Sequence, residues 1–170
     1  MTAPPAQRTP LRLRPPRHSV ERRAITWWIL RSVALHLPIL TGLVFAYARW
    51  ESARAWLVVV LAVLVVSGVV ETFVEPWWRY AVHRWEVTDD AVYARTGWLV
   101  REWRAAPISR IQTVDAVRGP VEQLLGLSTL RVTTASAKGT IDIGGLDHIV
   151  AADIAEELTA ITRRTPGDAT

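Results

Sequence analysis

Few titratable side chains in this chain are arranged as catalytic or metal-binding groups usually are. The histidines lie in four different segments without the paired spacing of metal ligands: His18, His36, His83 and His148. The adjacent Asp89 and Asp90 are typical of a turn. Ser109 stands beside Arg110, but no base lies near it in the sequence. We therefore expect a non-enzymatic protein without a catalytic, cofactor-binding or metal site.

Three ionisable residues lie inside long apolar runs, where a charge is costly and usually pairs with another group. Arg31 and His36 belong to the first run, and Glu71 belongs to the second. If the two runs form an antiparallel hairpin, these residues fall at overlapping depths. We predict that Glu71 contacts Arg31 or His36. The alternative is a proton or ion relay, but two helices alone cannot enclose a pathway.

The apolar runs are bounded by tryptophans, which favour the two interfaces of a bilayer. The six predicted interface anchors are Trp27, Trp28, Trp50, Trp56, Trp77 and Trp78. At the rise of an α-helix, Trp28 to Trp50 spans roughly 33 Å and Trp56 to Trp77 roughly 31 Å, close to the thickness of a hydrocarbon core. Helices of a soluble core would show a polar stripe, which these runs lack. The pattern predicts two transmembrane helices, at about residues 25–48 and 55–76.

The charge distribution predicts how the hairpin is oriented. Residues 1–75 carry nine Arg against four Glu, whereas residues 76–170 have a net charge of −1. By the positive-inside rule, residues 1–24 form a cytoplasmic tail, extended and disordered because of its prolines, and residues 165–170 form a second disordered tail. We expect a bacterial inner-membrane protein with both termini in the cytoplasm. The near-neutral C-terminal part argues against nucleic-acid binding, and no small-molecule substrate is inferred.

From Tyr80 onward the hydrophobic period becomes alternating, which indicates strands. One of these strands is expected over residues 98–104, with turns at Asp89-Asp90, Thr96-Gly97 and Lys138-Gly139. A final amphipathic helix follows Asp147, a good N-cap residue. Strands followed by one helix predict an α+β domain over residues 79–164, with an antiparallel sheet covered by that helix.

The ordered series Pro107-Ile108-Ser109-Arg110-Ile111-Gln112-Thr113-Val114, Leu124-Leu125-Gly126-Leu127 and Leu130-Arg131-Val132-Thr133-Thr134-Ala135 resembles the bacterial PH domain family of YdbS-like membrane proteins. Glu86-Val87-Thr88, Gly97 and the upstream helix pair also fit. The resemblance covers about residues 20–164. It implies a PH-like bent antiparallel sheet or partial barrel, closed by the C-terminal helix, and a larger partner with related domains or self-association. The chain departs from the family pattern at Arg118 and Gln123.

One cluster close to the second apolar run combines arginines with tryptophans, a composition that suits protein interfaces and lipid headgroups. This candidate interaction face consists of Arg95, Trp98, Arg101, Trp103, Arg104 and Arg110. The alternative is a solvated strand face with partly buried tryptophans.

The favoured function is a membrane-tethered scaffold that binds a second membrane protein. One alternative is an anionic-lipid sensor that uses the Arg-rich tail together with Arg101, Arg104 and Arg110. The other is a small transport subunit that uses His36 and Glu71.

Overall fold

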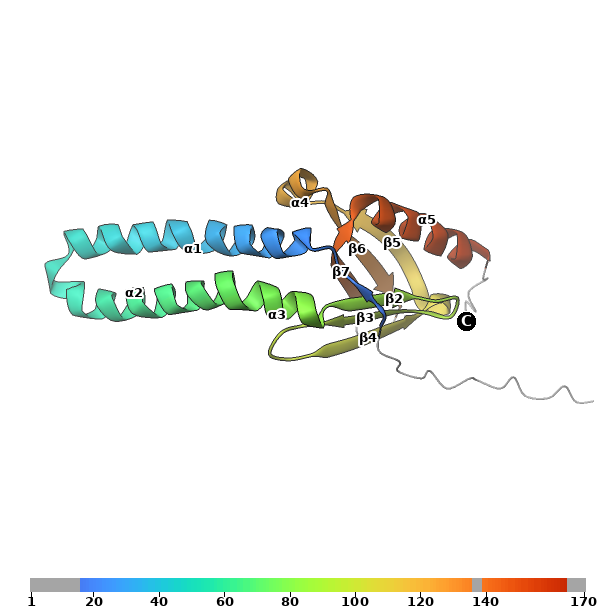
Figure 1. The fold of residues 1–170 in the computed structure, drawn as a ribbon, viewed down its shortest axis with the longest axis horizontal. Helices are drawn as coiled ribbons and strands as arrows, with labels where there is room; N and C mark the ends of the chain where they lie inside the picture. Colours follow the sequence, from blue (N-terminus) through green and yellow to red (C-terminus); the bar gives the residue numbers. More distant parts are fainter. Residues whose placement is uncertain (1–15, 136–138, 165–170) are drawn as a thin grey trace, which may run out of the picture.

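A computed structural model describes residues 16–135 and 139–164, and it consists of a long helical hairpin attached to a smaller α+β domain (Figure 1). The first arm is α1 (Arg23–Arg49). After the short 3-10 turn η1 (Glu51–Ala53), the second arm runs without a break through α2 (Arg54–Val69), the π-helical turn η2 (Val70–Val74) and α3 (Glu75–Val82). The first arm is 27 residues long, and the second is 32 residues long when η1 is counted with it (Glu51–Val82). Both are therefore long enough to cross the hydrocarbon core of a bilayer.

The apolar sides of the hairpin have almost no protein cover. In the most apolar 18-residue window of each arm, only 6% of the residues are buried. A helix in the core of a soluble protein is mostly buried, so this exposure argues against that interpretation of the two arms. The second arm also continues to Val82, beyond the predicted end at residue 76. Residues 80–82, predicted as strand, are helical, and the helix ends where the His83 N–H donates to the Arg79 carbonyl.

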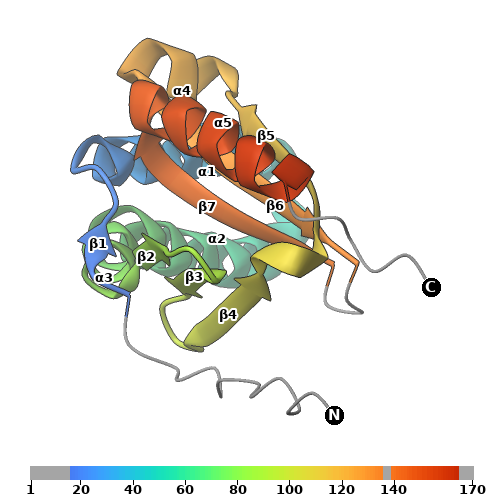
Figure 2. The same ribbon diagram turned by 90° about the vertical axis from the view of Figure 1, so that its right-hand side faces the viewer.

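The domain contains two antiparallel sheets and confirms the predicted α+β class. The first sheet has the order β1 (His18–Ser19), β2 (Arg84–Val87), β3 (Ala91–Thr96), β4 (Glu102–Pro107). The second has the order β5 (Ile111–Val117), β6 (Leu127–Thr134), β7 (Thr140–Asp147). The turn η3 (Ile108–Arg110) joins the sheets, α4 (Pro120–Leu125) connects β5 to β6, and α5 (His148–Arg164) follows β7. Seen from its free end, the domain carries α5 across the sheets (Figure 2). The sheets stay open and do not close into a barrel.

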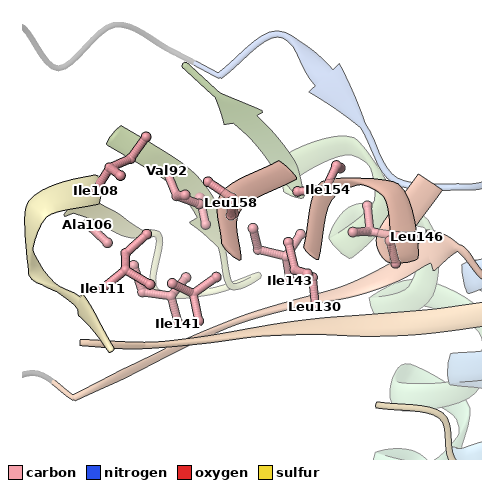
Figure 3. Close-up of a cluster of buried hydrophobic side chains, with 13 residues drawn as sticks. Val92, Ala106, Ile108, Ile111, Leu130, Ile141, Ile143, Leu146, Ile154 and Leu158 are labelled. Atoms are coloured by element: carbon pink, nitrogen blue, oxygen red, sulfur yellow. The ribbon is translucent and has the colours of Figure 1, made fainter. Parts of the chain in front are cut away.

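The main apolar core lies between the two sheets and α5 (Figure 3). Its largest fully buried side chains include Leu130, Ile143 and Leu158, which come from β6, β7 and α5. Alternate residues of β6 and β7 point inward, as the period of two in their sequences predicts. The domain therefore has its own core, separate from the hairpin.

Residues 16–24 do not form the disordered tail predicted for residues 1–24. His18 and Ser19 pair with Trp85 and Arg84 to form the edge strand β1. The Glu21 N–H then donates to the Gly145 carbonyl at 2.8 Å. A strand of two residues is too short to show an alternating hydrophobic pattern. The prediction of a disordered tail therefore depended only on its proline content. Residues 1–15 and 165–170 lie outside the described part of the chain.

The strand predicted over residues 98–104 is shifted. Residues 98–100 form a bend, and β4 begins only at Glu102. The cause is Gly97, whose φ of +102° turns the chain sharply after β3. The strand then runs on to Pro107, its last residue, where a missing N–H is tolerated.

Candidate functional site

The two arms face each other across a short series of polar side chains. The Ser32 and Thr72 hydroxyls lie 3.0 Å apart and are buried. On the same face, His36 Nδ1 lies 3.0 Å from the Ser32 carbonyl oxygen, and His36 Nε2 lies 3.8 Å from Glu71 Oε2. The structure therefore brings His36 and Glu71 together. Ser32 and Thr72 were not identified from the sequence, because serine and threonine are unremarkable in an apolar helix.

The backbone of the second arm is shaped for this contact. Glu71 and Thr72 lie in the π-helical turn η2, and π-turns in α-helices are frequent at functional sites. One turn earlier, Gly68 makes room for the imidazole, since a Cβ at this position would lie 3.1 Å from His36 Cδ2. A local change of helix geometry and a glycine thus place one carboxylate against one imidazole within the apolar part of the hairpin.

A cavity of about 220 Å³ lies between the two arms, at the part of the hairpin that is nearest to the domain. Its lining includes two arginines and two glutamates, Arg31, Arg79, Glu71 and Glu75, together with Trp28, Ser32 and Leu35. Arg79 Nη1 pairs with Glu75 Oε1 at 3.2 Å, and the Arg79 guanidinium lies 5.3 Å from the centre of the Trp28 ring. Arg31 thus shares this cavity with Glu71, whereas the ion pair of Glu71 is with His36. The spacing of Glu75 and Arg79, four residues apart, is the sequence signal that identifies this pair.

On the domain side, His83 continues this polar region. Its ring lies 5.4 Å from that of Trp28, and the residue is buried. His83 and Arg79 also line a second cavity of about 310 Å³, together with Thr96, Gly97, Glu102, Arg104, Thr140, Ile141 and Asp142. Arg79 therefore lines both cavities and connects the hairpin to the domain. A lone histidine gives no sequence signal of such a position.

The described residues contain no group of three His, Asp or Glu placed to hold a metal ion. The arrangement is one of paired charges around two small cavities at the junction between a membrane hairpin and a domain. Such pairs hold elements in a fixed relation and respond to protonation.

The family model described as bacterial PH domain matches residues 28–162, which is most of the chain and includes both the hairpin and the domain. The chain belongs to the bacterial PH domain family. It is 27% identical over 141 residues to a Bacillus subtilis (strain 168) protein named UPF0699 transmembrane protein YdbS, with 82% of this chain and 86% of that protein covered. No solved structure gives a significant match. The family and the exposed apolar arms identify the chain as a membrane protein with a bacterial PH domain.

Within this bacterial PH domain, the candidate interaction face does not form one surface. Arg95 Nε donates to the Val82 carbonyl at 2.9 Å, and its guanidinium lies over the Trp103 ring. Arg104 pairs with Glu102 and donates to the Thr140 carbonyl at 2.8 Å, so it bridges the two sheets. Arg95 therefore links β3 to the end of the second arm, and Arg104 links the two sheets.

The remaining members of the candidate face lie at opposite ends of β4. Trp98 and Arg101 are in the bend before the strand, close to the hairpin. Trp103 is partly exposed on the strand, and Arg110 lies in η3, beyond its far end. Of these four residues, Trp98 is the one that a hydrogen bond places beside the hairpin.

The predicted tryptophan anchors also divide into two groups. Trp50, Trp56, Trp77 and Trp78 are exposed at the ends of the arms. Trp28 is buried in a small core with Val20, Ala24 and Leu127, and Trp27 packs on the same core. Trp28 therefore lies against the bacterial PH domain and not against lipid. Periodicity cannot distinguish these two environments, because both are apolar.

Acidification is expected to destabilise the domain through His83. Burial, and secondarily the positive charge of Arg79, lower the pKa of His83 from 6.5 to about 4. Between these values the unfolded chain binds a proton that the folded chain does not, so stability falls as the pH is lowered through this window. Going from about pH 7.5 to about pH 5 removes about 2 kcal/mol of this contribution.

The measurement is the midpoint of thermal unfolding in detergent as a function of pH. His83→Gln stays neutral, so its midpoint should fall less with pH than that of the parent chain. His148→Gln, which removes an exposed imidazole, is the matched control and should follow the parent. Equal slopes for His83→Gln and the parent chain would contradict the assignment.

Proposed function

We propose that this protein is a non-enzymatic, membrane-tethered scaffold whose hairpin assembles with a second membrane protein or a second copy of the chain. The observation that supports it is Glu71. Its side chain is 42% exposed on the surface of the hairpin, and His36 Nε2 is 3.8 Å away. Glu71 lies roughly 9 Å below Trp77 along the second arm. A carboxylate exposed at this depth is costly in lipid, and a polar group of a neighbouring helix would relieve that cost.

A groove beside this carboxylate suits a neighbouring helix. It has a volume of about 280 Å³ and lies between α1 and α2, with His36, Gly68, Thr72 and Phe73 among its lining residues. Transmembrane helices approach each other most closely at small residues, and polar side chains form hydrogen bonds between them. Gly68 supplies a small residue in this groove, and Glu71, which pairs with the groove-lining His36, supplies a polar side chain beside it.

The proposed arrangement places both termini in the cytoplasm and the hairpin in the bacterial inner membrane. This orientation follows from the excess of arginine before α1, and the short connection between the arms faces outward. Confinement to the membrane raises the effective concentration of the domain near other membrane proteins, so weak contacts are sufficient for assembly. A lipid-sensing role through Arg104 has less support, because its guanidinium is engaged within the domain.

Site-specific photo-crosslinking in whole cells tests the proposal. A photoreactive amino acid at Phe73, exposed in the groove, should give one protein adduct of fixed mass, either with a second copy or with another membrane protein. The same amino acid at Val63, also exposed but outside the groove lining, is the control and should give little adduct.

Glu71→Leu should reduce the Phe73 adduct roughly fivefold, as expected for the loss of a polar contact between helices worth about 1 kcal/mol. Glu71→Gln keeps a hydrogen-bonding group and should retain more of it. If Phe73 and Val63 give only lipid adducts, with and without Glu71, the hairpin has no protein neighbour at this face and the proposal is wrong.

A further inference from the structure

The bend between β3 and β4 exposes apolar side chains next to the end of the hairpin. Leu99 is 77% exposed and Val100 is 72% exposed, although both belong to the folded domain. The Trp78 Nε1–H donates to the Trp98 carbonyl at 3.0 Å, which fixes the bend beside α3. Figure 1 shows the β3–β4 connection extending along α3 towards the hairpin. The bend thus lies at the level where the second arm leaves the membrane.

The shape of this bend is built into the sequence. Gly97 has a φ of +102°, and a Cβ at this position would lie 1.9 Å from the Val100 carbonyl oxygen. Only glycine fits this geometry, which turns the three residues Trp98 to Val100 away from the sheet. An apolar tip held by a required glycine and a tryptophan hydrogen bond is a defined feature and differs from an apolar residue exposed by chance.

A second exposed apolar side chain, that of Leu124 in α4, lies on the other side of the hairpin. α4 packs beside the first turn of α1, where Arg23 Nη1 donates to the Leu125 carbonyl at 3.0 Å. Its Leu124 is 87% exposed. In Figure 1, α4 and the β3–β4 connection both lie at the end of the domain from which the two arms emerge. The domain therefore has exposed apolar side chains beside both arms, at the end from which the hairpin emerges.

We infer that the domain rests on the bilayer that its own hairpin crosses, with Leu99 and Val100 inserted at the boundary between headgroups and acyl chains. The occupant is lipid because the tip is continuous with the exposed Trp77 and Trp78 of α3, at the interfacial end of the second arm. Arg101, which directly follows the tip, suits anionic headgroups. This contact would hold the domain in one orientation, in addition to the tether. The inference does not depend on the partner proposed for Glu71.

The chain has no cysteine, so single-cysteine variants can carry a nitroxide spin label without background. The full chain is reconstituted into vesicles of phosphatidylethanolamine and phosphatidylglycerol, and collision rates are measured with oxygen, which partitions into lipid, and with a water-soluble nickel chelate. Leu99→Cys is the test position. Asp89→Cys, exposed in the turn between β2 and β3, is the aqueous control, and Val63→Cys, exposed on α2 outside the groove, is the lipid reference.

The label at position 99 should collide more with oxygen than with nickel, as at position 63, and position 89 should show the reverse. A preference for nickel at position 99 would place the tip in water and overturn the inference. Low rates with both reagents would mean that a protein covers the tip, which overturns it equally. Because Leu99 is mostly exposed, the label fits without disturbing the core, and unchanged thermal unfolding of the labelled protein verifies this.

Discussion

Replacing Gly145 with alanine is expected to destabilise the protein by about 3 kcal/mol, because two costs add at this position. Gly145 has a φ of +80°, in the region that L-residues rarely adopt. A Cβ there would also lie 2.7 Å from the Cβ of Ala24, a fully buried residue in the first turn of α1. Neither backbone can move freely, since the Glu21 N–H is bonded to the Gly145 carbonyl. The substitution therefore forces α1 away from β7.

Gly139→Ala separates the two costs. Gly139 also has a positive φ, +67°, but a Cβ there would meet nothing within 4 Å. Only the backbone strain remains, so we expect a loss of about 1 kcal/mol. Thermal unfolding of both variants in the same detergent, followed by near-ultraviolet circular dichroism, gives the comparison. If the two variants lose equal stability, Gly145 does not set the contact between α1 and the domain.

The contact between α1 and β7 shows why the junction was harder to predict than the hairpin or the domain that it joins. The tryptophan spacing predicted both apolar arms, and the alternation in β6 and β7 predicted their strands, because each pattern is local. The junction depends on Ala24 and Trp28 of α1, which are far in the sequence from Gly145 and Leu127 and meet them only in the folded chain. The two-residue strand β1 exists only because β2 provides its partner.

The polar groups also divide into those that the local sequence identifies and those that depend on the fold. His36 and Glu71 were recognisable because ionisable residues are conspicuous in apolar helices. His83 lies outside the apolar run, and its burial against Trp28 depends on the fold. Leu99 and Val100 were predicted as strand, because the sequence indicated the turn at Thr96-Gly97 but neither its extension to Val100 nor the hydrogen bond from Trp78.

Leu130→Ala is expected to have the largest effect in the domain core, a loss of about 4 kcal/mol. Leu130 is fully buried in the central strand β6, where it pairs with Ala116 of β5 and Ile143 of β7. Three strands and α5 enclose the side chain, so the surroundings cannot collapse into the cavity that alanine would leave. The midpoint of thermal unfolding should fall by about 15 °C or more for a domain of this size.

Ile149→Ala is the matched control for Leu130→Ala, because it also shortens a large aliphatic side chain but at a position that is 60% exposed in α5. We expect its stability to change by less than about 0.5 kcal/mol. The helical content of the hairpin should stay the same in both variants, since Leu130 does not belong to the small core around Trp28. A hairpin signal that disappears together with the domain signal in Leu130→Ala would show that the arms depend on the domain core, contrary to the division between the two parts.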